Sequence, residues 1–87
     1  METSSFPYGC ERWFDLKSSM VVGAGVREGW LVVRFVNGSF YRYANAAERL
    51  DELMKAESVG QYFNRRIKST YAYTKLTEPT WPEGEEE

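Results

Sequence analysis

The chain has 87 residues, of which 43% are hydrophobic and 16% aromatic. This is enough for one small globular core and too little for two. The only cysteine, Cys10, excludes an intramolecular disulfide, and the absence of histidine removes the commonest metal ligand and general base. Histidine-dependent nucleophilic catalysis is therefore excluded, and we expect neither a metal nor a cofactor.

Charge is distributed unevenly along the chain. All 11 basic residues precede residue 77, whereas 5 of the 13 acidic residues lie in 77–87. The stretch 77–87 also holds two prolines, a glycine and Trp81, and this composition predicts a disordered acidic tail. The sequence contains neither an apolar run of about 20 residues nor a signal-peptide pattern. We therefore expect a soluble, cytoplasmic protein that does not enter a membrane.

The first half of the chain predicts an antiparallel meander. Residues 1–17 form an aromatic extension without periodicity, which we expect to drape on the domain. Residues 18–26 predict a first strand marked by two glycines, and strands over 30–36 and 39–43 follow after very short connections. Connections this short require neighbouring strands to run in opposite directions.

Asn37-Gly38 predicts the turn of a β-hairpin and permits two registers. A two-residue loop pairs Val36 with Ser39, whereas a three-residue loop with left-handed Gly38 pairs Phe35 with Ser39. We favour the second register because it separates apolar from basic side chains. Its inner face groups Leu31, Val33, Phe35, Tyr41 and Tyr43. Its outer face carries Val32, Arg34, Phe40 and Arg42, which form an arginine-aromatic surface unless the N-terminal aromatics pack over it.

Two consecutive helices follow the hairpin. Asn45 and Glu48 fit a capping box for a helix that ends near residue 56, and Ser58 fits the N-cap of the next helix. Residues 71–76 predict a possible fourth strand. The predicted fold over residues 18–76 is therefore a small α+β domain, with a three-stranded antiparallel meander, a possible fourth strand and two packed helices.

Two groups of residues are candidate binding sites. A basic cluster on the second helix suits the binding of phosphate, and an aromatic ring beside it suits the stacking of a base. Arg42 extends this basic cluster. The alternative interpretation is that the cluster is an ordinary solvated helix face. The cluster comprises Tyr62, Arg65, Arg66 and Lys68. Ser58 and Gly60 begin the same helix and suit an anion, although capping explains them equally well. Pairs of neighbouring Asp and Glu residues could suggest acid-base catalysis, but they lie on stretches that face solvent. We therefore expect no enzymatic activity.

Several spacings together resemble the KTSC domain family, a short module at the C-terminus of some lysyl-tRNA synthetases and in stand-alone bacterial and phage proteins. The resemblance is carried by Phe35-x-x-Gly38-x-x-Tyr41-x-Tyr43, by the strand before it, and by the run from Ala56 to Ile67. The chain departs from the family pattern at residues 44–47, where Ala-Asn-Ala-Ala replaces a valine-proline entry to the helix. The synthetase context implies RNA binding.

Three functions follow from these observations. The first is a non-catalytic module that binds RNA or another nucleic acid through the basic helix, Arg34 and Arg42, and the hairpin aromatics. The second is a phage- or bacteria-encoded modulator that binds a protein of a host machine, either through Phe40 and the hairpin face or through the acidic tail. The third is capture of a small anion at Ser58.

Overall fold

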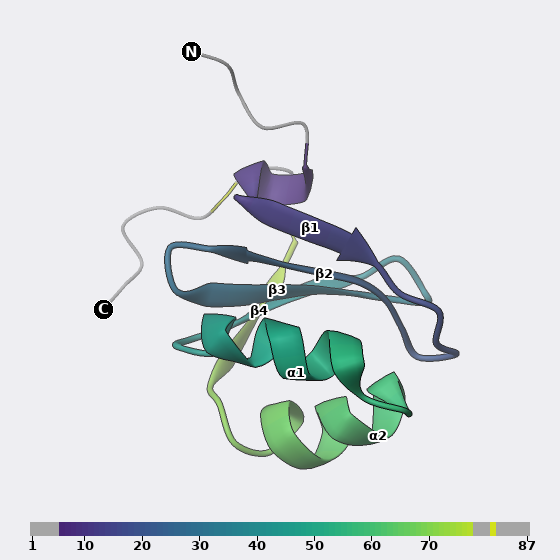
Figure 1. The fold of residues 1–87 in the computed structure, drawn as a ribbon. Helices are drawn as coiled ribbons and strands as arrows, with labels where there is room; N and C mark the ends of the chain where they lie inside the picture. The colour runs from purple at the N-terminus through teal and green to yellow at the C-terminus, as the bar shows by residue number, and fades with distance from the viewer. Residues whose placement is uncertain (1–5, 78–80, 82–87) are drawn as a thin grey trace.

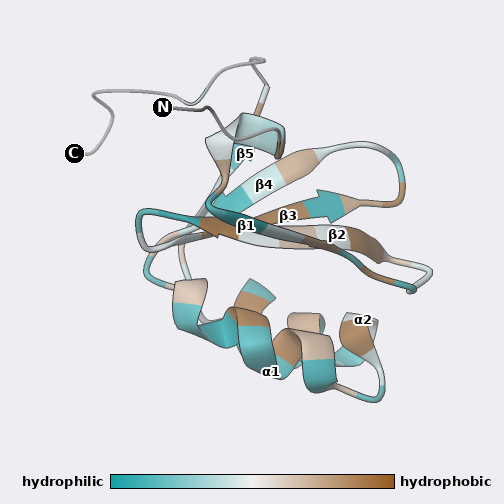
Figure 2. Cartoon of the chain, turned by 45° about the horizontal axis from the view of Figure 1, so that its top comes forward, coloured by the Kyte–Doolittle hydropathy of each residue, from teal (hydrophilic) through white to brown (hydrophobic). Residues whose placement is uncertain are grey.

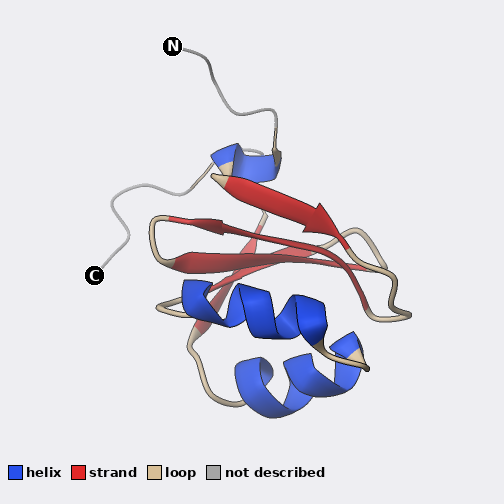
Figure 3. Ribbon diagram, in the orientation of Figure 1, coloured by secondary structure: helices blue, strands red, loops and turns tan. Residues whose placement is uncertain are grey.

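The computed structural model describes residues 6–77 and 81. One five-stranded antiparallel sheet holds its strands in chain order, and the helices of residues 47–68 cover one face (Figures 1 and 3). The strands are β1 Arg12–Asp15, β2 Val21–Arg27, β3 Trp30–Phe35, β4 Phe40–Tyr43 and β5 Tyr73–Leu76. The helical segments are the 3₁₀ turn η1 Pro7–Gly9, η2 Ala47–Arg49 leading into α1 Leu50–Lys55, and α2 Val59–Tyr62 continuing into the π-helical η3 Phe63–Lys68.

The α+β class is confirmed, but the predicted strand count was too low. The possible fourth strand is β5, and β1 adds an edge strand within the extension that we expected to be irregular. Four residues are too few to show periodicity in the sequence.

None of the helices in the described part of the chain has the length and apolarity needed to cross a bilayer. The predicted acidic tail falls outside the described residues, apart from Thr77 and Trp81.

The glycines of β2 explain how β1 joins the sheet. Trp13 pairs with Gly25, and its ring lies over both Gly23 and Gly25. A Cβ atom added to Gly25 would lie 2.2 Å from the Arg12 carbonyl oxygen and 2.6 Å from the Trp13 ring. The missing side chains thus leave room for the indole, as expected where a glycine permits close approach within a sheet.

The hairpin adopts the register with the three-residue loop. The Phe35 amide donates to the Ser39 carbonyl at 2.8 Å, and the Gly38 amide donates to the Phe35 carbonyl at 2.9 Å. Gly38 has a φ of 92°, in the left-handed region that favours glycine. Val33 consequently pairs with Tyr41. The tyrosines of β4 therefore face the helices, as predicted.

Buried side chains lie on both faces of the sheet. Figure 2 shows hydrophobic residues both in the strands and on the helices that pack beneath them. The main core lies between sheet and helices, and its buried residues are Val21, Ala24, Val26, Leu31, Val33, Tyr43, Ala46, Leu50, Leu53, Phe63 and Ile67. A second, smaller cluster lies on the outer face; it contains Cys10, Val32 and Leu76, with Tyr8, Trp13, Phe40 and Trp81 packed against them. The N-terminal aromatics therefore cover the outer hairpin face, which was the exception stated in our prediction.

The two predicted helix caps have different outcomes. Ser58 caps α2, since its hydroxyl accepts from the Gln61 amide at 3.4 Å. The Asn45 cap was wrong: Asn45 has a φ of 59°, and the residue before η2 is Ala46, which makes no side-chain cap. Asparagine tolerates the left-handed conformation, and here it turns the chain out of β4. The amide of the first helical residue, Ala47, instead donates to the carbonyl of Gly29 in the β2–β3 turn.

Replacing Gly25 with alanine is expected to lower the free energy of unfolding by about 1–3 kcal/mol. The new methyl group would collide with the Arg12 backbone and the Trp13 ring, so β1 would have to move. Thermal unfolding followed by circular dichroism should show a melting temperature at least about 4 °C lower.

Gly60→Ala is the matched control. A Cβ atom at Gly60 lies 3.6 Å from Met20, which is ordinary contact, and alanine favours the helix by up to about 1 kcal/mol. Its melting temperature should stay unchanged or rise. Equal losses in the two variants would contradict the assignment of Gly25 to the Trp13 contact.

Candidate functional site

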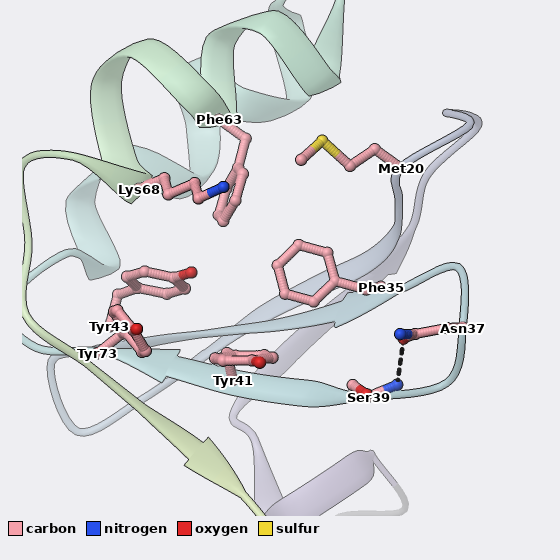
Figure 4. A pocket seen from close by; sticks show the side chains of 9 residues that line it. All are labelled: Met20, Phe35, Asn37, Ser39, Tyr41, Tyr43, Phe63, Lys68 and Tyr73. Atoms are coloured by element: carbon pink, nitrogen blue, oxygen red, sulfur yellow. Dashed lines mark hydrogen bonds between the residues drawn. The ribbon is translucent and has the colours of Figure 1, made fainter.

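An aromatic pocket opens on the helical side of the sheet, between the hairpin and η3. It has a volume of about 210 Å³. Its lining residues are Met20, Phe35, Asn37, Ser39, Tyr41, Tyr43, Phe63, Lys68 and Tyr73. Figure 4 shows that these side chains come from the hairpin, β5, the segment before β2 and the helix, and that they surround a common space. We call this the aromatic pocket.

The rings of the pocket support one another. Phe35 lies edge-to-face against Tyr41 at 5.2 Å and against Phe63 at 5.4 Å between ring centroids. Tyr43 packs on Phe63 at 5.4 Å in the same manner, and Tyr41 lies 5.6 Å from Tyr73. Edge-to-face aromatic pairs are favourable beyond the area they bury. The pocket wall is therefore preformed.

The two tyrosines of the Tyr-x-Tyr pair occupy different depths. Tyr43 is only 3% exposed, and burial raises the pKa of its hydroxyl to about 12, so Tyr43 is neutral at physiological pH. Tyr41 is half-buried, and its neighbour Tyr73 is 58% exposed. Tyr43 therefore belongs to the core floor, whereas Tyr41 and Tyr73 present ring surface to an incoming group.

One lysine lines the pocket, and a second lies on the same face of the sheet as Tyr41. Lys68 closes η3, and its ammonium group points toward the Phe63 ring and the space beside it (Figure 4). Lys75 is the sheet partner of Tyr41, and partners across a ladder share a face. Sequence reasoning overlooked Tyr73; the alternation Tyr71-Ala72-Tyr73 was the available signal for it.

The predicted basic cluster divides into two sites. Arg65 and Arg66 are exposed and line a separate hollow of about 350 Å³. The hollow is completed by Ala56, Glu57, Ser58, Gln61 and Tyr62. Lys68 lies in the aromatic pocket instead. Hydrogen bonds in a π-helix span five residues, so side chains that would share a flank of an α-helix are rotated apart.

Tyr62 belongs to a hydrogen-bond network that links the two helices. Its hydroxyl donates to Glu52 of α1, whose other partner is Arg49 at 2.9 Å. Arg49 also donates to the Tyr71 hydroxyl at 2.9 Å. The bond from Tyr62 and then the bond from Arg49 lower the pKa of the Glu52 carboxyl. Tyr62 therefore links α2 to α1 through its hydroxyl, and it lines the hollow that Arg65 and Arg66 also line.

The arginines of the outer hairpin face differ in exposure. Arg42 is 3% exposed and lies under two tryptophans, which corrects the expectation of an accessible phosphate contact. Phe40 is half-buried against Tyr8 and Trp13. Arg34 remains exposed, with its guanidinium 5.7 Å from the centre of the Phe40 ring.

The candidate anion site at Ser58 and Gly60 is occupied by the protein's own groups. The Ser58 hydroxyl caps Gln61, and Gly60 faces Met20 and Ser18 at ordinary contact distances. A Cβ atom would fit at Gly60, so the space beside the segment before β2 does not require glycine. Within residues 6–77 and 81, no three histidine, cysteine, aspartate or glutamate side chains are grouped to hold a metal ion.

The family model of the KTSC domain matches residues 17–73, more than half of the chain. The chain belongs to the KTSC domain family. Every residue that lines the aromatic pocket falls within the KTSC match, whereas β1 and Trp81 lie outside it. A search of curated proteins finds no match to the chain. In this chain the pocket thus lies within the KTSC match, whereas Tyr8, Trp13 and Trp81 of the outer cover lie outside it.

Replacing Glu52 with glutamine is expected to destabilise the protein at neutral pH. A carboxyl whose pKa is lowered by folding stabilises the native state above its unfolded pKa, and this contribution is lost as the pH falls through the folded value. Thermal melts should therefore separate the variant from the wild type at pH 7 and bring them together as the pH falls below the folded pKa of Glu52. A difference that stays constant with pH would contradict the role given to this carboxylate.

Proposed function

We propose that this KTSC protein is a non-catalytic binding module for single-stranded RNA, and that an unpaired base enters the aromatic pocket. The supporting observation is the preformed ring wall with Lys68 at its side (Figure 4). Sequence-specific RNA recognition commonly uses unpaired bases stacked on aromatic side chains. A volume of about 210 Å³ is smaller than a typical drug-sized site and suits one planar group.

The chemistry of the pocket favours a nucleotide over a purely apolar ligand. Tyr41 and Tyr73 offer ring surface for stacking, while Asn37 and Ser39 place polar groups at the hairpin end. The ammonium group of Lys68 supplies a positive charge for the phosphate beside the base. A base, a sugar edge and a phosphate thus each meet a suitable group within one hollow.

The arginines of η3 supply a second, less specific contribution. Arg65 and Arg66 are exposed, and the phosphate backbone interacts with such cations independently of sequence. The net charge of the whole chain is −2, so electrostatic attraction is modest. We expect weak binding that is sensitive to salt and owes its base preference to the aromatic pocket.

The other two candidate functions have less support. A protein partner that docks on the outer hairpin face would have to displace the aromatic side chains that cover Val32 and Arg42. A small anion at the start of α2 would compete with the Ser58 hydroxyl oxygen for the Gln61 amide.

Tyr41→Ala is expected to weaken the binding of a fluorescently labelled oligouridine of about ten nucleotides by about 5- to 150-fold, the value of one lost base stack. Fluorescence anisotropy in low salt measures this. Unchanged binding in Tyr41→Ala would contradict the pocket as the base site.

The double variant Arg65→Ala, Arg66→Ala should weaken the binding of all RNA sequences alike and preserve the affinity ranking of oligouridine against oligoadenosine.

Lys68→Ala should reduce the salt dependence of binding, because one phosphate contact is lost. The slope of log affinity against log salt should become shallower by about 0.7 for a single strand. Arg34→Ala is the matched control, since Arg34 is also an exposed cation but lies on the outer face of β3. An equal change of this slope in both variants would indicate general attraction to positive charge and would refute a specific role for Lys68.

A further inference from the structure

Trp81 is held on the outer face of the sheet by two arginines and a tryptophan. Its ring centre lies 4.8 Å from the Arg27 guanidinium carbon and 4.7 Å from that of Arg42. The Arg42 guanidinium also lies 3.9 Å from the centre of the Trp30 ring, which meets Trp81 nearly at a right angle, 6.1 Å away. We call the surface formed by Arg27, Trp30 and Arg42 the arginine slot.

The arginine slot is built on three strands of the sheet. Arg27 and Trp30 are cross-strand partners on either side of the Glu28-Gly29 turn, and Arg42 lies on β4. The Arg27 guanidinium is fixed further by a 2.6 Å hydrogen bond to the Tyr8 carbonyl. Trp81 comes from beyond β5 and outside the KTSC match. The slot is therefore part of the sheet, and its occupant is an appended residue.

The chemistry of the slot suits a planar ring that carries negative charge nearby. Guanidinium planes stack on nucleobases as they stack on indoles, and two arginines attract phosphate. An indole, like a purine, consists of a fused five- and six-membered ring. In the sequence, Trp81 is followed within six residues by Glu83, Glu85, Glu86 and Glu87. A flat ring followed by acids repeats the pattern of a base followed by phosphates.

We propose that the arginine slot is a second stacking site for an unpaired base, and that Trp81 closes it from within the same chain. The inference rests on the proposed function, because it requires that the protein binds single-stranded nucleic acid. Competition with Trp81 multiplies the apparent affinity of the slot by the fraction of molecules in which the slot is open. Trp81 thus regulates how many bases the protein holds.

The wild-type protein provides the first test. On titration with oligoadenosine of about ten nucleotides, the indole N–H resonance of Trp81 should move to the position of a solvent-exposed tryptophan. The resonance of Trp13, which is packed on the β2 glycines, should stay in place. A Trp81 resonance that keeps its folded position at saturation would overturn the proposal.

Variants of the full chain provide the second test. Trp81→Ala should bind the oligonucleotide about tenfold more tightly if Trp81 closes the slot nine-tenths of the time. Trp81→Tyr keeps an aromatic cover and should give a smaller gain, which guards against loss of folding in the alanine variant. Adding Arg27→Ala to Trp81→Ala should remove the gain. Replacing the four glutamates after Trp81 with glutamine should increase the affinity for the oligonucleotide less than Trp81→Ala does.

The outcomes separate this proposal from the proposed function. If the wild type binds through Tyr41 and Lys68 but Trp81→Ala gives no gain, the aromatic pocket stands and the arginine slot is refuted. If Trp81→Ala binds in an Arg27-dependent manner while Tyr41→Ala has no effect, the slot is supported and the pocket is refuted. If no form binds in low salt, both are refuted.

Discussion

The register of the β3–β4 hairpin is the constraint on which the rest of the structure depends. Gly38 takes a left-handed conformation that closes a three-residue loop, and this choice fixes the face of every side chain on both strands. A shift by one residue would send Tyr41 and Tyr43 to the outer face and Arg42 into the main core. The aromatic pocket and the arginine slot therefore both follow from one turn.

The two faces of the sheet are then completed in different ways. Helices from within the KTSC match close the inner face, and they leave the aromatic pocket open beside η3. Segments outside the match close the outer face: Trp13 lies on the bare glycines of β2, and Trp81 lies on Arg27 and Arg42. The first closure leaves ring surface accessible. The second covers the basic surface with residues of the same chain.

Short-range patterns in the sequence predicted the structural features that depend on neighbouring residues. Asn37-Gly38 and the alternation around it gave the hairpin and its register, and Ser58 gave the second helix cap. These features are decided by residues within a few positions of one another. The same reasoning placed Tyr41 and Tyr43 on the helical side.

Features decided by distant contacts were missed. β1 is a strand because Trp13 finds the β2 glycines, and Arg42 is buried because Trp81 returns from beyond β5. Asn45 turns the chain instead of capping it, since the Gly29 carbonyl meets the helix start. The π-helical winding of η3, which separates Lys68 from Arg65, has no signature in the residue types. The misses at β1, Arg42 and Asn45 each involve a partner from a distant part of the sequence.

Photocrosslinking tests the central claim, that the aromatic pocket receives an unpaired base, most directly. An oligonucleotide that carries 5-iodouridine is irradiated with the full-length protein in low salt, and the crosslinked residue is found by mass spectrometry. We expect crosslinks to Tyr41, Tyr73 or Phe35, whose rings line the pocket. Crosslinks confined to the Arg65 and Arg66 hollow, with none in the pocket, would contradict it.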